Sequence, residues 1–164
     1  MNNSATTRMI SKIALEYNGN DKGMAELAAI NFLLGSNPED QFLEMKIVAA
    51  RNSKVKKWAL TGYISPPEEI GKLLYDEELT DIAIEVLNRI GVTENNQFRL
   101  DIHNSTKQKH IHFVVNRMNI HGKCTVKSHK IGERFGEAVR QICQERNLKT
   151  DVEIGIEKKA EMMK

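Results

Sequence analysis

The chain has 164 residues, 40% hydrophobic and 28% charged, with a formal net charge of +2. This balance supports one domain with its own core, and so small a net charge gives no overall sign of a nucleic-acid partner. Its two cysteines are too few for a disulfide framework, and no apolar run reaches the roughly 20 residues needed to span a bilayer. We therefore expect a cytoplasmic protein with reduced thiols and no membrane partner.

The spacing of apolar residues predicts strands and helices along the chain. In chain order we expect a strand at 9–17, a helix at 24–34, a helix from 38 to about 51, a strand at 56–64, a helix at 79–90, strands at 98–103 and 110–118, a short strand at 124–126 and a helix at 131–143. The fold class predicted is α+β, with a central, mostly antiparallel sheet of about five strands flanked by helices. Residues 1–148 form the predicted domain, and residues 149–164 form a charged tail, either helical or frayed.

Three histidines are the most informative group in the chain. His110 and His112 alternate with apolar residues, so they share one face of a strand. A polar loop joins this strand to the one that ends at His103, and a hairpin would set His103 opposite His110 and Asp101 opposite His112. Three neutral imidazoles can bind a divalent cation, and Asp101 could orient one of them. The alternative interpretation is a set of ordinary polar residues on the wet face of the sheet.

Lysines gather at two other places in the chain. Their positions are Lys54, Lys56 and Lys57, followed by Trp58, and then Lys123, Lys127 and Lys130. Cations beside an aromatic ring can follow a DNA backbone and stack on a base. The alternatives are a solvated charged surface for the lysines and a place in the core for Trp58.

The histidine pattern, His103 followed by His110-Ile111-His112 and then Asn116-Arg117, resembles the metal motif of MobA-type relaxases. These are the mobilisation nucleases of plasmids and conjugative elements, in the histidine–hydrophobe–histidine nuclease group. Residues 13–18, which include Tyr17, resemble the strand that ends in the family's nucleophilic tyrosine. The resemblance covers residues 10–148.

The resemblance implies a metal-dependent enzyme that nicks and rejoins single-stranded DNA at an origin of transfer through a covalent 5′-phosphotyrosyl intermediate. It implies Tyr17 as the nucleophile and the three histidines as ligands of Mg²⁺ or Mn²⁺. It also implies DNA contacts from Asn116 and Arg117, and relaxosome accessory proteins as partners. Tyr63 and Tyr75 are the fallback nucleophiles.

The sequence departs from the family pattern at Ser105, where many members carry an aspartate. Asp101 is the nearest substitute for that acid, as a group that orients a ligand or assists proton transfer. The chain is also shorter than relaxases that carry long C-terminal regions. Two alternative functions follow: a nonenzymatic DNA-binding mobilisation accessory protein with a degenerate site, and a rolling-circle replication initiator of the same nuclease group.

Overall fold

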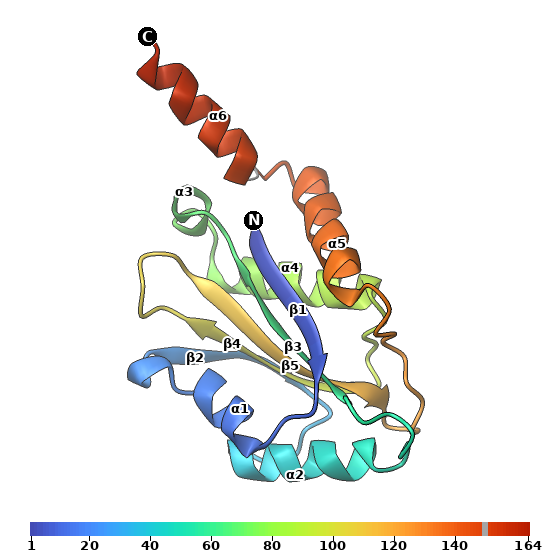
Figure 1. Cartoon of the computed structure of the whole chain (residues 1–164). Coiled ribbons are helices and arrows are strands. Elements are labelled where there is room, and N and C mark those ends of the chain that lie inside the picture. Colours follow the sequence, from blue (N-terminus) through green and yellow to red (C-terminus); the bar gives the residue numbers. More distant parts are fainter. Residues whose placement is uncertain (149–150) are drawn as a thin grey trace.

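The computed structural model describes residues 1–148 and 151–164, and its centre is a single antiparallel sheet (Figure 1). The strands are β1 (Asn2–Arg8), β2 (Ala25–Asn31), β3 (Ala59–Ser65), β4 (Asn96–His103) and β5 (His110–Asn119). Their spatial order is β1-β3-β5-β4-β2, so β5 is central and β1 and β2 form the edges. The predicted α+β class with an antiparallel sheet of five strands is confirmed for this described part.

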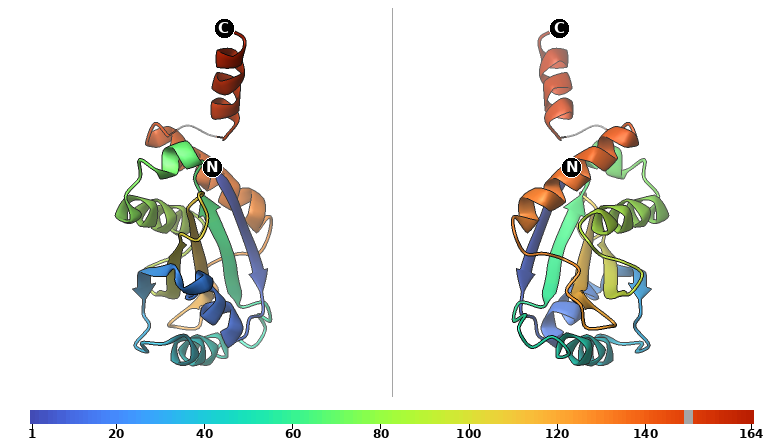
Figure 2. Two further views of the ribbon diagram at one scale, coloured as in Figure 1. Left: turned by 90° about the vertical axis from the view of Figure 1, so that its left-hand side faces the viewer. Right: turned by 90° about the vertical axis from the view of Figure 1, so that its right-hand side faces the viewer.

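Helices cover the sheet on both faces (Figure 2). The helical elements described are α1 (Lys12–Asn18), the 3₁₀ turn η1 (Asp21–Gly23), α2 (Pro38–Ala49), α3 (Glu68–Gly71), α4 (Asp76–Arg89), α5 (Ile131–Glu145) and α6 (Asp151–Met162). The pair α4 and α5 covers one face, α1 and α2 cover part of the other, and α6 lies away from the sheet (Figure 1). The predicted charged tail is helical from Asp151 onward, while positions 149 and 150 lie outside the described residues. None of the helices described here is long and apolar enough to cross a membrane.

The main core lies between the sheet and the pair α4 and α5. Phe113 and Leu100 from the strands, Ile82 from α4 and Phe135 from α5 are all fully buried there, and the rings of Phe113 and Phe135 are 5.3 Å apart. Each such side chain contributes about 1.5–3 kcal/mol by leaving water. The centre of this face of the sheet is therefore apolar.

A smaller core lies on the opposite face, beneath α1 and α2. It joins Leu15 of α1 and Met45 of α2 to Val114 on β5 and to Trp58, which packs on Phe42 at 6.2 Å between ring centroids. The interpretation of Trp58 as a core residue is confirmed. Because this core occupies only one end of the sheet, the histidine end of the same face stays open.

The predicted strand at 9–17 is wrong. Residues 12–18 form α1 instead, in which Leu15 is buried while Ile13 and Tyr17, four residues apart, both face solvent. Lys, Ala, Leu and Glu favour a helix, and Ser11 and Gly19 flank it. The true first strand, β1, has a largely polar sequence because it is an edge strand paired only with β3.

The predicted helix at 24–34 is also wrong, because residues 25–31 form the other edge strand, β2. Its alanines favour a helix by propensity, but pairing with β4 overrides that preference. The short strand predicted at 124–126 is reduced to an isolated bridge between Met118 and Cys124. The helices predicted from 38, 79 and 131 and the strands predicted at 56, 98 and 110 are confirmed, with shifts of a few residues at their ends.

Candidate active site

The β4–β5 hairpin brings the three histidines together. His103 pairs with His110 and Asp101 pairs with His112, which is the predicted register. The rings of His103 and His112 stack with centroids 4.0 Å apart, and those of His110 and His112 are 5.9 Å apart. Three imidazoles therefore form one cluster on the half-covered face of the sheet.

The cluster favours uncharged imidazoles. Burial, reinforced by the neighbouring His103 and His110, lowers the pKa of His112 to about 4. Burial and the nearby His103 also lower the pKa of His110. Because a metal ligand must offer a nitrogen lone pair, both residues have the protonation state that binds metal at neutral pH.

His103 is held at both ring nitrogens by the segment that joins α1 to β2. Its Nε2 lies 2.7 Å from the carbonyl oxygen of Asn18, and its Nδ1 lies 3.9 Å from Oδ1 of Asp21. The side chain is only 7% exposed. With an oxygen on each side, this imidazole is the most constrained of the three.

The donor set, three imidazoles beside one carboxylate, fits a divalent transition-metal cation such as Mn²⁺ better than Mg²⁺, which prefers oxygen ligands. As the rings stand, no group of three or more histidine, cysteine or acidic side chains among the described residues converges on one point. His103 must turn its Nε2 away from the Asn18 carbonyl before three rings can share an ion.

Asp101 lies opposite His112 as predicted, but its carboxylate is engaged elsewhere. It is 1% exposed and accepts hydrogen bonds from Nε of Arg99 at 2.9 Å and from Nη2 of the same guanidinium at 2.9 Å. Arg99 also donates to Gln41 at 2.8 Å. A buried guanidinium needs such a partner. Asp101 therefore neutralises Arg99 in this structure, and its role in catalysis stays a prediction.

Asp21 is the acid that the sequence did not single out. Its carboxylate accepts hydrogen bonds from the Oγ of Ser105 at 2.6 Å and from the backbone N–H of Ser105 at 3.1 Å. Partial burial would raise the pKa of Asp21, but these hydrogen bonds and the nearby His103 lower it below its ordinary value. The only sequence signal was its place in a turn-forming stretch, which gave no hint that the turn faces the hairpin.

Tyr17 stands at the last turn of α1, with its side chain 68% exposed. Its ring meets that of His103 edge-on, with centroids 6.3 Å apart. A second tyrosine, Tyr63 on β3, lies 5.8 Å from His112 and 6.2 Å from His110 between ring centroids. The cluster is thus flanked by two tyrosines, one from a helix and one from the sheet.

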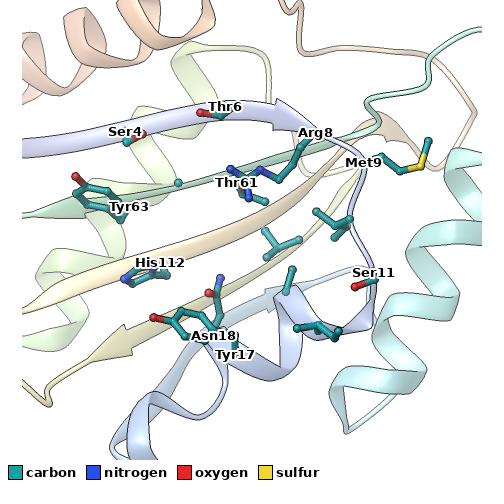
Figure 3. A pocket seen from close by; sticks show the side chains of 15 residues that line it. Ser4, Thr6, Arg8, Met9, Ser11, Tyr17, Asn18, Thr61, Tyr63 and His112 are labelled. Atoms are coloured by element: carbon teal, nitrogen blue, oxygen red, sulfur yellow. The ribbon is translucent and has the colours of Figure 1, made fainter.

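An open groove of about 580 Å³ leads away from these rings (Figure 3). Tyr17 and His112 face it from α1 and β5, and Arg8 reaches over it beside Thr61. The other polar residues that line it are Ser4, Thr6, Ser11, Asn18 and Tyr63. A cation and several hydroxyl groups along an open groove suit a phosphate backbone. Sequence reasoning missed Arg8, because β1 was not recognised as a strand.

Two of the predicted DNA-binding residues, Asn116 and Arg117, are buried. Asn116 is fully buried and donates to the carbonyl of Met45, while Arg117 is 6% exposed and donates to the carbonyls of Val126 and Lys57. The structure thus uses both side chains to tie elements together, and we leave them out of the DNA surface.

The lysines are exposed, at different distances from the groove. Lys54, Lys56 and Lys57 precede β3, next to the point where Arg8 pairs with Ala59. They therefore stand at the far end of the groove from the histidines. The remaining three occupy the connection from β5 to α5: Lys123 in the turn after β5, Lys127 beyond it and Lys130 at the start of α5. Because α5 packs on the opposite face, Lys127 and Lys130 lie outside the groove.

The site thus combines an exposed tyrosine, a histidine cluster and an open groove on one face of an antiparallel sheet. The family model described as "Relaxase: MobA/VirD2-like, nuclease domain" matches residues 17–148, and the chain belongs to this family of DNA-nicking enzymes. The match begins at Tyr17 and contains all three histidines. No curated protein and no solved structure matches the chain.

Proposed function

We propose that this protein is a metal-dependent relaxase that nicks and rejoins one DNA strand at an origin of transfer, and so initiates mobilisation of a plasmid or other mobile element. The observation that carries the proposal is the position of Tyr17. Its exposed ring lies 6.3 Å from that of His103 and lines the same groove as His112. The family match gives this tyrosine a substrate, a single DNA strand.

The reaction proposed is a transesterification. The Tyr17 hydroxyl oxygen forms a bond to the phosphorus of a phosphodiester, and the bond from phosphorus to the 3′-oxygen breaks. The phenol, with an ordinary pKa near 10, gives its proton to a base, and the departing 3′-oxygen takes one up. Because one phosphodiester replaces another, the reverse reaction rejoins the strand.

His103, His110 and His112 are the residues that would hold the divalent ion. When bound there, the ion neutralises the phosphate and stabilises the charge that develops during transfer. The protein's own contribution is to set a neutral, partly buried ligand group beside an exposed nucleophile.

In this proposal the DNA strand lies in the groove. Arg8 can pair with a phosphate, the hydroxyls of Thr6 and Thr61 can donate to phosphate oxygens, and Tyr63 can stack on a base next to the scissile bond. Beyond Arg8 the strand would continue toward the lysine loop at residues 54–57. We assign the sequence-independent part of binding to this path.

The test uses a labelled single-stranded oligonucleotide that spans the cognate origin, with Mn²⁺ or Mg²⁺ present. The wild-type protein should form a covalent adduct that shifts on a denaturing gel, and Tyr17→Phe should form none. Tyr63→Phe is the matched control inside the groove, and Tyr75→Phe is the control on the surface. An adduct that survives Tyr17→Phe and is lost with Tyr63→Phe would move the nucleophile to β3.

Two observations favour the accessory-protein alternative. The three imidazoles do not face one common point, and Nε2 of His103 contacts the carbonyl of Asn18. This alternative predicts oligonucleotide binding without an adduct under every metal condition. The replication-initiator alternative shares the adduct and differs in the substrate. It predicts cleavage of a replication origin in preference to an origin of transfer.

A further inference from the structure

The end of α1 and its connection to β2 carry the proposed nucleophile and the groups that face His103. Tyr17 lies within α1, the carbonyl of Asn18 contacts Nε2 of His103, and the carboxylate of Asp21 faces Nδ1. β2 then starts at Ala25, which pairs with His103 itself. Pairing of the strands therefore fixes this connection against the histidine cluster.

We propose that Asp21 is the acidic positioning residue of the site, which holds His103 from its Nδ1 side, and that Ser105 is the residue that anchors this carboxylate. The inference deepens the proposed function, because it concerns the same histidine cluster.

The geometry around Asp21 supports this role. The carboxylate faces the Ser105 hydroxyl at 2.6 Å, the Ser105 N–H at 3.1 Å and the His103 Nδ1 at 3.9 Å, and the backbone of Asn104 also donates to it. The two hydrogen bonds from Ser105 fix the orientation of the carboxylate, whose side chain is only 11% exposed. Once Nε2 leaves the Asn18 carbonyl, a carboxylate beside Nδ1 would set the ring orientation and strengthen Nε2 as a ligand.

The η1 turn has an unusual backbone conformation at Asp21, the residue that faces His103. Asp21 and Lys22 have φ values of 43° and 56°, in the left-handed region that side chains other than glycine rarely adopt. Asn20 supports the turn by accepting a hydrogen bond from the N–H of Gly23 at 3.0 Å. The strained conformation carries the Asp21 side chain inward while the Lys22 side chain faces solvent.

The two acids near the cluster have separate tasks. Asp101 accepts hydrogen bonds from both Nε and Nη2 of Arg99, whereas Asp21 accepts hydrogen bonds from the uncharged Ser105. Ser105 is uncharged and offers two donors, so it suits a carboxylate that arrives from another element. An aspartate at position 105 would instead repel Asp21. The site therefore holds one carboxylate, which either of two positions could supply.

This exchange can be tested directly. Mn²⁺ affinity is measured on the full chain by equilibrium titration, and the ring nitrogens of His103 are followed by ¹⁵N NMR in metal-free protein. Asp21→Asn, which keeps the size of the side chain, should weaken Mn²⁺ binding by about 10-fold to 100-fold and shift the His103 nitrogen resonances. Lys22→Gly is the matched control in the same turn and should change neither.

The reciprocal exchange is the sharpest arm. Asp21→Ser alone should lose Mn²⁺ affinity, and Asp21→Ser combined with Ser105→Asp should regain at least about 10-fold of it. The inference is overturned if Asp21→Asn stays within about twofold of the wild-type affinity with unchanged His103 resonances, or if the double variant is no better than Asp21→Ser. Neither readout uses DNA. If Asp21→Asn loses Mn²⁺ affinity but the wild-type protein forms no DNA adduct, the proposed nicking activity is contradicted and the role of Asp21 is not.

Discussion

The two faces of the sheet differ in how completely they are covered. Against α4 and α5, the central strands present fully buried apolar residues such as Phe113 and Leu100. On the opposite face, α1 and α2 cover one end, and the rest carries the histidines and a buried Arg99–Asp101 pair. No buried side-chain polar atom lacks a hydrogen-bond partner in the part of the chain that is described. The buried polar groups of the histidine face are therefore all hydrogen-bonded, and this face holds the candidate site where the other face holds the main core.

Substitution of neighbouring residues on β5 should show that the two faces contribute differently to the free energy of unfolding. Phe113→Ala opens a cavity between the sheet and α5 and should lower the free energy of unfolding by about 3–5 kcal/mol. His112→Ala, one residue away on the other face, should cost under about 1 kcal/mol in metal-free protein. Denaturant unfolding measures both. Equal losses would mean that the histidine face is a core like the other.

Metal affinity should separate the faces in the opposite sense. His110→Ala or His112→Ala removes a ligand and should weaken Mn²⁺ binding by at least about 100-fold. His121→Ala and His129→Ala are matched controls, since both histidines are exposed and lie outside the cluster. Titration calorimetry reports the affinities. A loss of the same size in the controls would place the ion elsewhere.

The pH dependence of folding should also come from the histidine face. Burial lowers the pKa of His112 to about 4 from an ordinary 6.5, so the unfolded chain binds its proton first as the pH falls. The free energy of unfolding should therefore decrease between about pH 6.5 and pH 4 in the presence of a chelator. His112 should account for about 1–2 kcal/mol of this decrease after allowance for solvent screening. Comparison with His112→Gln isolates that part, and a wild-type curve that coincides with the variant's would contradict it.

The smallest effect is expected along the groove. Arg8→Gln should weaken binding of a single-stranded oligonucleotide several-fold and reduce the salt slope by about 0.7, because one phosphate contact is lost. Lys130→Gln, at the start of α5 on the other side of the sheet, should leave both unchanged. Fluorescence anisotropy at several salt concentrations measures them. If Lys130→Gln has the larger effect, the DNA does not follow the groove.

The sequence predicted the centre of the sheet well and its edges poorly. β4 and β5 alternate apolar and polar residues around a short polar loop, so the pattern alone gave the register that places His103 opposite His110. β1 is polar and β2 is rich in alanine, and only pairing with β3 and β4 makes them strands. The number of strands was right, although two of the predicted positions were not.

Part of the candidate site could likewise be predicted from the sequence. The histidines follow from spacing on one hairpin, and Tyr17 follows from the family resemblance although it lies on a helix. The sequence also placed Asp101 opposite His112, but it did not indicate that Arg99, two residues earlier on the same face, would be the partner of its carboxylate. Asp21 could not be predicted, because its contact with His103 depends on how the α1–β2 connection folds against the hairpin.

The central claim is that Tyr17 joins the DNA beside the histidine cluster. The most direct measurement is mass spectrometry of the tryptic peptides from wild-type protein that has been treated with the origin oligonucleotide and Mn²⁺. We predict the nucleotide adduct on the peptide of residues 13–22, in which Tyr17 is the only tyrosine. An adduct on the peptide of residues 58–72, which carries Tyr63, or no adduct on any peptide, would contradict the claim.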